Sequence, residues 1–314
     1  MTKPLAVVAW LTTSILRSQS VPMPMVDYHQ HLVSPSAARL FDNLRREGNR
    51  VPEARSAERL IADLDAAHIQ RAVVLSTAYW FASPRIQREA GADEHADVSA
   101  ENDWTAHEAE RFPGRLTVFF SVNPLREWAV DEVERCAKDG RFKGLKLHFA
   151  NSGVDMLNSR HIEQLRRVFE AANTHRLAIV VHLWSGLSYG REQARAFLTQ
   201  LLPAAPDIVV QIAHFAGGGP GYTESALEVF ADAIRMGNSA AKNLYFDVST
   251  VAEGLDSPGR ETFARRIRQV GLSRVLYGTD PGSPAERWAT FRSAVPLTDE
   301  EFRTIAGNVA PYLR

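Results

Sequence analysis

The chain has 314 residues, of which 45% are hydrophobic, and this is enough to bury one large core. Its 36 lysines and arginines nearly cancel its 37 aspartates and glutamates, and no dense basic run occurs, which argues against a nucleic-acid partner. Cys136 is the only cysteine, so the chain can form neither an intramolecular disulfide nor a thiolate metal cluster. Any metal ion must therefore be held by nitrogen and oxygen atoms.

Residues 1–22 have two interpretations. The apolar stretch Leu5–Leu16 resembles the core of a signal peptide, although Thr12, Thr13 and Ser14 interrupt it and Arg17 follows it. The alternative is an N-terminal extension, or translation that begins at Met23 or Met25. Both an exported and a cytoplasmic protein are compatible with this segment. The stretch is too short for a transmembrane helix and no other segment is a candidate, so we expect no membrane partner.

Eight short apolar runs predict β-strands. They are nearly continuous runs of Val, Ile, Leu and Phe, which is typical of parallel strands buried on both faces. In chain order they are Met25–Leu32, Ala72–Thr77, Leu116–Val122, Gly144–Phe149, Ala178–Leu183, Ile208–Phe215, Leu244–Ser249 and Arg274–Gly278.

Stretches with the apolar spacing of amphipathic helices lie between these runs. The alternation predicts an α/β fold of the (β/α)8 barrel type, a TIM barrel, with residues 23–314 as a single domain. An open, doubly wound sheet is the alternative, but it normally carries a glycine-rich turn after its first strand, where this chain has His29-Gln30-His31. The predicted helices are Ser56–Ala67, Ala129–Lys138, Ile162–His175, Arg191–Leu202, Ser225–Met236 and Glu261–Val270.

Two connections are candidates for the rim of a binding site. Gly217–Gly221 follows the sixth predicted strand and lacks the Lys-Ser/Thr pair of a phosphate-binding loop, so we interpret it as a mobile rim loop. The longest connection, Ala78–Arg111, contains aromatic residues such as Tyr79 and Trp80. Long loops in compact domains are commonly lids or binding loops, so we expect this connection to cap the site.

His29 and His31 are the first sign of chemistry. Because residues two apart in a strand point the same way, both imidazoles can face one ion. Taken alone, the pair is equally compatible with buried histidines that are simply hydrogen-bonded.

Further ionisable residues stand at the ends of later predicted strands: Lys146, His148, His182, His214 and Asp280. In a barrel the carboxyl ends of all the strands meet on one face, which is where barrel enzymes build their active sites. Burying so many polar groups without partners would cost about 1–3 kcal/mol each, and a shared metal ion removes that cost. The sequence therefore predicts a metal site on this face.

These motifs resemble the amidohydrolase superfamily, in particular its amidohydrolase-related branch. The resemblance runs from about Val26 to the C-terminus and implies a distorted barrel with a divalent ion, usually zinc. The ligands that it implies are His29, His31, His182 and Asp280, with His214 as the residue that polarises the substrate, helps to activate water or binds a second ion. The matching segments are Val26-Asp27-Tyr28-His29-Gln30-His31, Gly144-Leu145-Lys146-Leu147-His148, Val181-His182, Ala213-His214-Phe215-Ala216-Gly217-Gly218, Tyr277-Gly278-Thr279-Asp280-Pro281 and Gly307-Asn308-Val309-Ala310.

Three imidazoles and one carboxylate leave a position for water, as in a catalytic ion site. Asp280 or His214 could accept the proton of that water. In some superfamily members the lysine that matches Lys146 is carboxylated and bridges two ions, so one ion and two ions are both open. A plain ammonium near the substrate, or a lysine that caps its strand and touches nothing, are the other readings of Lys146.

His148 could face the site or sit on a loop, and Trp184 is a candidate substrate wall. Asp247 lies in the seventh predicted strand and Glu253 follows it, so either could line the rim of the site, and we interpret both as structural. Arg85 and Arg191 are weaker candidates for binding a substrate carboxylate.

Three functional hypotheses follow. The first is a metal-dependent hydrolase that acts on a C–N or C–O acyl bond of a small molecule. The second is a decarboxylase or hydratase, that is a lyase, acting on an aromatic or unsaturated carboxylic acid, although no arginine occupies a position diagnostic of it. The third is a barrel that binds without turnover, which disagrees with the complete set of ligands. A small-molecule substrate is expected, and a homo-oligomer is left open.

Overall fold

The computed structural model describes residues 21–46, 53–86 and 92–314, with side chains from 42 to 46 excepted. The signal peptide considered above falls on residues outside these ranges. Within the described ranges, no helix combines the length and the apolar character needed to cross a membrane.

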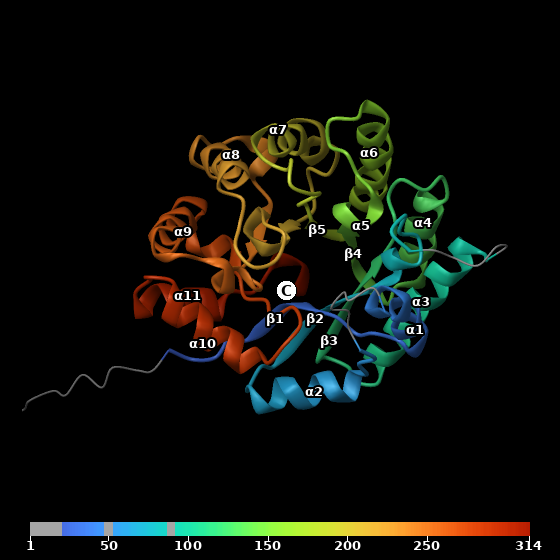
Figure 1. The fold of residues 1–314 in the computed structure, drawn as a ribbon, viewed down its shortest axis with the longest axis horizontal. Coiled ribbons are helices and arrows are strands. Elements are labelled where there is room, and N and C mark those ends of the chain that lie inside the picture. The colour runs from blue at the N-terminus through green and yellow to red at the C-terminus, as the bar shows by residue number, and fades with distance from the viewer. Residues whose placement is uncertain (1–20, 47–52, 87–91) are drawn as a thin grey trace, which may run out of the picture.

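Eight parallel strands form one sheet whose order in space is the order in sequence (Figure 1). The first and last strands meet, because the Tyr28 amide donates to the Tyr277 carbonyl at 2.8 Å and the Asp280 amide donates to the His29 carbonyl at 2.7 Å. The predicted (β/α)8 barrel is therefore confirmed. Its strands are β1 (Val26–Gln30), β2 (Arg71–Leu75), β3 (Leu116–Ser121), β4 (Phe142–His148), β5 (Ala178–His182), β6 (Val210–Ile212), β7 (Leu244–Asp247) and β8 (Val275–Leu276).

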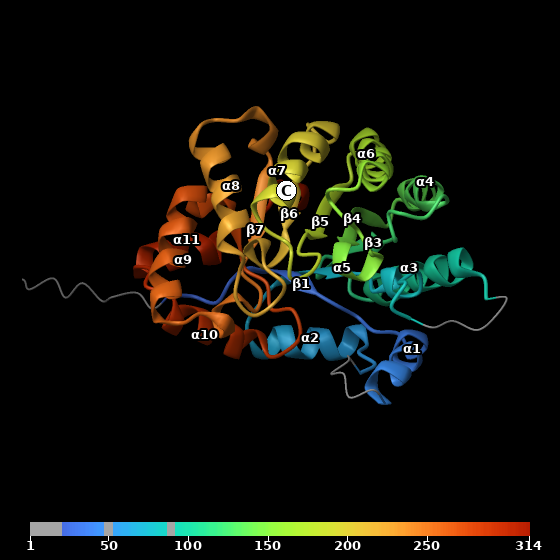
Figure 2. The ribbon, with the colours of Figure 1, turned by 45° about the horizontal axis from the view of Figure 1, so that its top comes forward.

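Helices surround the sheet, and Figure 2 shows them as a ring outside the strands. The α-helices are α1 (Pro35–Arg46), α2 (Ala57–Ala66), α3 (Glu94–Glu110), α4 (Ala129–Asp139), α5 (Phe149–Ser152), α6 (Ser159–Thr174), α7 (Arg191–Ala196), α8 (Glu224–Arg235), α9 (Ser257–Val270), α10 (Pro284–Ala294) and α11 (Asp299–Gly307). The π-helix η2 (Phe197–Leu201) extends α7. Short 3₁₀ turns are η1 (Ala78–Trp80), η3 (Leu202–Ala204), η4 (Ala213–Ala216), η5 (Ser239–Ala241), η6 (Val251–Gly254), η7 (Leu272–Arg274) and η8 (Pro311–Leu313).

Helix α2 illustrates how local sequence fixes this ring. The Ser56 side chain caps its first turn by accepting from the Arg59 amide. Leu60 and Leu64 lie four residues apart on one face and are fully buried, each stabilising the fold by about 1.5–3 kcal/mol. Beyond the helix, His68 takes a left-handed conformation (φ 56°), which ends the helix and returns the chain to β2.

The core has two main parts. One lies between the sheet and the helices. The other fills the barrel at the starts of the strands, where Val26, Tyr28, Phe119 and Val180 pack together. Tyr312 in the C-terminal turn η8 packs against this second part. The chain therefore closes the amino end of its own barrel.

Several predicted strands are shorter than expected. β6 ends at Ile212, so His214 does not lie on a strand as the apolar run suggested. His214, Phe215 and Ala216 all have positive φ angles (52°, 48° and 64°), which no strand allows. β1 contains a register shift between Asp27 and Gln30 and ends before His31.

The interpretation of Ala78–Arg111 as one long lid is wrong, because its second half is helix α3. Periodicity missed this helix because its buried face carries polar residues, among them Glu101, Asn102 and Thr105. Residues 87–91 of this segment lie outside the described residues, and Tyr79 and Trp80, near its start, line the cavity at the carboxyl ends of the strands. In the glycine run, a Cβ on Gly217 would stand 2.5 Å from the Gly221 carbonyl oxygen, so this loop is tightly packed.

Candidate active site

His29 is buried at the end of β1, and both of its ring nitrogens have partners. Its Nδ1 lies 3.2 Å from Asp247 Oδ2. A carboxylate only accepts, so Nδ1 carries the proton and Nε2 keeps its lone pair. That Nε2 lies 3.4 Å from Lys146 Nζ and 4.0 Å from Asp280 Oδ1.

His31 and His214 have the same tautomer for a related reason. His31 Nδ1 donates to the Leu75 carbonyl at 2.7 Å, and His214 Nδ1 donates to the Ser249 carbonyl at 2.9 Å. Their Nε2 atoms therefore face the site as acceptors, at 3.7 and 3.8 Å from the two oxygens of Asp280. The left-handed backbone at His214 and Asp280 (φ 57°) is the kind of strain that proteins keep where a side chain must be aimed.

The donor atoms of His29, His214 and Asp280 all lie within 4.8 Å of one another. Two imidazole nitrogens and a carboxylate oxygen form a donor set suited to a divalent cation. His31 Nε2 lies 3.7 Å from Asp280 Oδ1, the same oxygen that lies 4.0 Å from His29 Nε2. This group differs from the predicted ligand set, because it contains His214 and does not contain His31 or His182.

His182 ends β5 and is buried beside this group. Its ring lies 4.9 Å from the His214 ring and stacks on His148 at 3.9 Å, with an angle of 11° between the planes. His148 accepts from the Asn151 amide through Nδ1 at 3.3 Å. The fold thus brings together all seven ionisable residues that the sequence placed at the strand ends. They are His29, His31, Lys146, His148, His182, His214 and Asp280.

Four imidazoles of this site, those of His31, His148, His182 and His214, have pKa values that keep them neutral. Burial and the neighbouring His29 lower the pKa of His31 to about 3. Burial likewise lowers the pKa values of His148, His182 and His214. Neutral imidazole is the form that ligates a metal or accepts a proton.

Asp280 is an ionised acceptor amid these rings. Burial alone would raise its pKa, but electrostatic interactions with the surrounding His29, His214 and His31 side chains and with the Lys146 ammonium outweigh burial and hold the pKa below its ordinary value. A carboxylate is therefore present at neutral pH.

Lys146 is 1% exposed, so a lysine that merely caps its strand in solvent is excluded. Burial lowers its pKa to about 8. Its ammonium points at His29 Nε2, so a positive charge lies beside the donor group.

Asp247 has a larger part in the site than the sequence suggested. Beyond its contact with His29, it accepts from Gln211 Nε2 at 2.8 Å and from the His214 amide at 3.1 Å. Ser249 also donates to it, through both its amide and its hydroxyl. One carboxylate thus orients two of the three donor residues. Its place at the end of the seventh apolar run was the signal that could have found it.

A comparison with known families identifies the chain's relatives. The family model described as amidohydrolase matches residues 26–310. The chain belongs to the amidohydrolase family. The resemblance seen in the motifs is confirmed, and the protein is an enzyme of this family.

A search of the curated proteins finds no significant match for this amidohydrolase. Solved structures agree with its fold. One is a 5-carboxyvanillate decarboxylase from Novosphingobium aromaticivorans with manganese and 4-hydroxy-3-methoxy-5-nitrobenzoic acid, at TM-score 0.60 and 15% identity over 91% of this chain and 94% of that one. Another is a dihydroxybenzoic acid decarboxylase from Polaromonas with manganese and 2-nitroresorcinol, at 0.60 and 15% over 91% and 95%. A third is a probable 2-pyrone-4,6-dicarboxylic acid hydrolase from Acinetobacter baumannii, at 0.57 and 16% over 90% and 96%.

A cavity of about 490 Å³ reaches the site of this amidohydrolase at Asp280, His31 and His148. Tyr79 and Trp80 form its aromatic side, and they come from the first half of the predicted lid. Arg55 also lines it, but its guanidinium already donates to Gln30 Oε1 at 2.7 Å and Asp63 Oδ2 at 2.9 Å. The remaining lining residues are His31, Val33, Glu53, Ala54, Arg59, Asp63, Thr77, His148, Asn151, Asp280, Pro281 and Gly282.

Three further candidates are not among the residues that line this cavity. Trp184 packs against Gly218, where an added Cβ would stand 2.8 Å from the indole, so it braces the glycine loop. Arg85 donates to Asn151 Oδ1 at 2.9 Å, behind the cavity wall. Arg191 is paired with Glu228 on α8.

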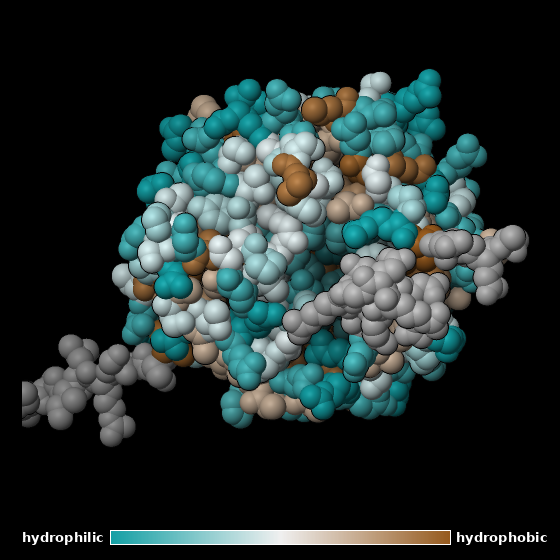
Figure 3. Space-filling view, viewed as in Figure 1, coloured by the Kyte–Doolittle hydropathy of each residue, from teal (hydrophilic) through white to brown (hydrophobic). Residues whose placement is uncertain are grey.

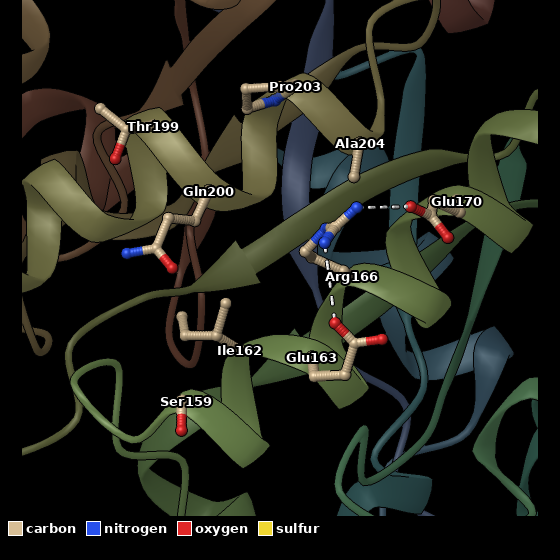
Figure 4. A pocket seen from close by; sticks show the side chains of 9 residues that line it. All are labelled: Ser159, Ile162, Glu163, Arg166, Glu170, Thr199, Gln200, Pro203 and Ala204. Atoms are coloured by element: carbon tan, nitrogen blue, oxygen red, sulfur yellow. Dashed lines mark hydrogen bonds and ion pairs between the residues drawn. The ribbon is translucent and has the colours of Figure 1, made fainter.

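A second cavity, of about 510 Å³, lies on the outside of the barrel between α6 and η2 (Figure 4). Its arginine, Arg166, is paired with Glu163 at 3.6 Å and Glu170 at 3.3 Å. None of the residues at the strand ends lines it. We therefore assign no chemistry to this cavity.

Figure 3 shows the face seen in Figure 1, where the described hydrophobic residues form small, separate patches. This face is largely hydrophilic around the barrel.

Proposed function

We propose that the protein is a metal-dependent hydrolase that cleaves a C–N or C–O acyl bond in a small organic molecule. One observation carries the proposal: the groups that face one another around Asp280 are proton acceptors. The ionised Asp280 carboxylate lies 3.8 Å from the lone-pair nitrogen of His214 and 3.7 Å from that of His31. Such a site favours the removal of a proton from water over the donation of a proton to a substrate.

The same residues would hold the ion. His29, His214 and Asp280 supply the closest donors, and His31 and His182 lie beside them. When bound there, a divalent ion would polarise a substrate carbonyl and make a water molecule more acidic. Zinc suits the nitrogen-rich set, and manganese, present in two of the similar structures, is the other candidate. We propose one ion.

Each protein group then has a task. Asp280, whose carboxylate has two oxygens, takes a proton from water as the water oxygen bonds to the carbonyl carbon. His214 has only one nitrogen free, and that nitrogen is assigned to the ion. The Lys146 ammonium stabilises the negative charge that develops on the carbonyl oxygen. The acyl C–N or C–O bond then breaks, and the stored proton passes to the leaving nitrogen or oxygen. Tyr79 and Trp80 hold an apolar part of the substrate.

The test is a hydrolysis screen with lactones, cyclic amides and esters, on protein loaded with zinc or with manganese. For any substrate found, Asp280→Asn should lower kcat/KM by at least about 10³-fold, because the replacement removes a base and an ion ligand. A matched control is Asp232→Asn, which changes a carboxylate on α8, outside the cavity, that is paired with Arg235. Normal turnover by Asp280→Asn would contradict the mechanism.

A decarboxylase acting on an aromatic acid is the second candidate. The aromatic side of the cavity, formed by Tyr79 and Trp80, favours a flat ring, and two of the similar structures are decarboxylases of such acids. Against it, both terminal nitrogens of Arg55 already donate to Gln30 and Asp63, so its guanidinium is not available to bind a substrate carboxylate through two hydrogen bonds. Release of carbon dioxide from hydroxybenzoates, with no hydrolysis of any acyl substrate, would favour this candidate.

A further inference from the structure

The C-terminal turn η8 enters the amino end of the barrel, opposite the site. There the Tyr312 ring contacts Tyr28 and Phe119, with ring centres 6.2 and 5.2 Å apart. The Tyr312 hydroxyl continues inward, among groups that belong to the strands. Apolar packing explains the ring but not the direction of the hydroxyl.

That hydroxyl begins a hydrogen-bonded chain across the barrel. Tyr312 Oη donates to Gln211 Oε1 at 2.7 Å. Gln211 Nε2 donates to Asp247 Oδ2 at 2.8 Å, and the same oxygen lies 3.2 Å from His29 Nδ1. Gln211, Asp247 and His29 are all at most 1% exposed. Three hydrogen bonds thus connect the C-terminal turn with a donor residue of the site.

In each of these hydrogen bonds, the donor and the acceptor are fixed. A phenol that donates to the Gln211 oxygen leaves the amide NH₂ for Asp247. An amide turned the other way would set its oxygen against the Asp247 carboxylate. With its carboxylate so held, Asp247 accepts from His29 Nδ1, and His29 Nε2 faces the site as an acceptor. Burial raises the pKa of Tyr312 well above its ordinary value, so the hydroxyl keeps its proton.

We propose that Tyr312 is a positioning residue for the metal centre, acting through Gln211 and Asp247 on the orientation and tautomer of His29. This inference rests on the proposed metal-dependent function. It assigns to the last turn of the chain a role in ion affinity in addition to closing the barrel.

The test measures zinc affinity by competition with a chromophoric chelator, on the full chain. Tyr312→Phe removes one oxygen and keeps the ring, and it should weaken zinc binding about 3–10-fold, less than the 10–100-fold typical of a direct partner of a ligand. Gln211→Met should weaken it about 10-fold or more. In the double variant, Tyr312→Phe should add nothing to Gln211→Met, because the connection is already broken.

Tyr28→Phe is the matched control. Its hydroxyl lies at the same end of the barrel, where it accepts from the Ala310 amide at 2.7 Å and donates to the Asn308 carbonyl at 3.2 Å. This hydroxyl makes no hydrogen bond to Gln211 and so takes no part in the connection to His29. This variant should lower the melting temperature of the metal-free protein while leaving zinc affinity within twofold.

Three outcomes would overturn the inference. They are unchanged zinc affinity in Tyr312→Phe, an equal loss of affinity in Tyr28→Phe, or additive losses in the double variant. The proposed function fails separately, and the inference with it, if the native protein binds neither zinc nor manganese.

Discussion

At the amino ends of the strands, aromatic and aliphatic side chains such as Tyr28, Phe119 and Tyr312 fill the barrel. At the carboxyl ends of the same strands, the buried groups are imidazoles, an ammonium and carboxylates. Left-handed backbone conformations aim His214 and Asp280 into the site. The comparison teaches that one end of the barrel supplies stability and the other holds chemistry that costs stability. Asp247 and Gln211 connect the two ends.

The largest expected effect lies at the chemical end. Asp247→Asn removes a charge that accepts from His29, Gln211 and Ser249, and it should lower zinc affinity about 10–100-fold. Isothermal titration with zinc measures this effect. The control is Glu253→Gln, which changes a rim carboxylate paired with Arg287. A change of less than threefold for Asp247→Asn would remove Asp247 from the site.

At the amino end, Phe119→Ala should act on stability alone. The ring is fully buried, and its removal should cost about 3–5 kcal/mol of unfolding free energy. Urea denaturation measures the cost. The zinc affinity of the folded fraction should change less than threefold, and a tenfold loss would break the separation between the two ends.

The pH dependence of stability sharpens the same comparison. The pKa of His31 is about 3 in the folded protein, against an ordinary value of 6.5. Below pH 6.5, His31 therefore becomes protonated in the unfolded chain but stays neutral in the folded protein. Stability of the metal-free protein should therefore fall as pH drops, by about 2 kcal/mol from this group between pH 6.5 and 5. His31→Gln should flatten the fall in thermal melts from pH 7 to 5. An equally steep fall in the variant would contradict this account.

Helical prediction failed where burial is polar. The eight strands could be predicted because parallel barrel strands are nearly continuous apolar runs. Helix α3 could not be predicted in this way, because its buried face carries polar residues such as Glu101. The buried Glu101 carboxylate is stabilised by hydrogen bonds from Ser34 and Thr77. Such partners come from distant strand ends and leave no periodic signal.

For the site, strand order was enough to bring His29, Lys146 and Asp280 together. The left-handed turn at His214, which aims its Nε2 at Asp280, depends on Asp247 and Ser249 and has no sequence signature. The tautomers likewise depend on carbonyls such as that of Leu75. Which strand ends converge could be read from sequence, but which atoms meet could not.

The smallest effect is expected at the outer cavity between α6 and η2. Arg166→Ala should change the unfolding free energy by no more than about 0.5–1 kcal/mol, since its ion pairs with Glu163 and Glu170 are solvent-exposed. It should leave zinc affinity unchanged. An altered zinc affinity, measured by titration, would give this cavity a role that its charges do not suggest.

Metal content tests the central claim most directly. Protein purified, stripped with a chelator and reloaded with zinc or manganese should hold one tightly bound ion per chain by mass spectrometry of the metal. His29→Ala should lose that ion, whereas His107→Ala, on the exposed side of α3, should keep it. A native protein that binds no ion, or a His29→Ala variant that binds it as tightly as the native chain, would contradict the account.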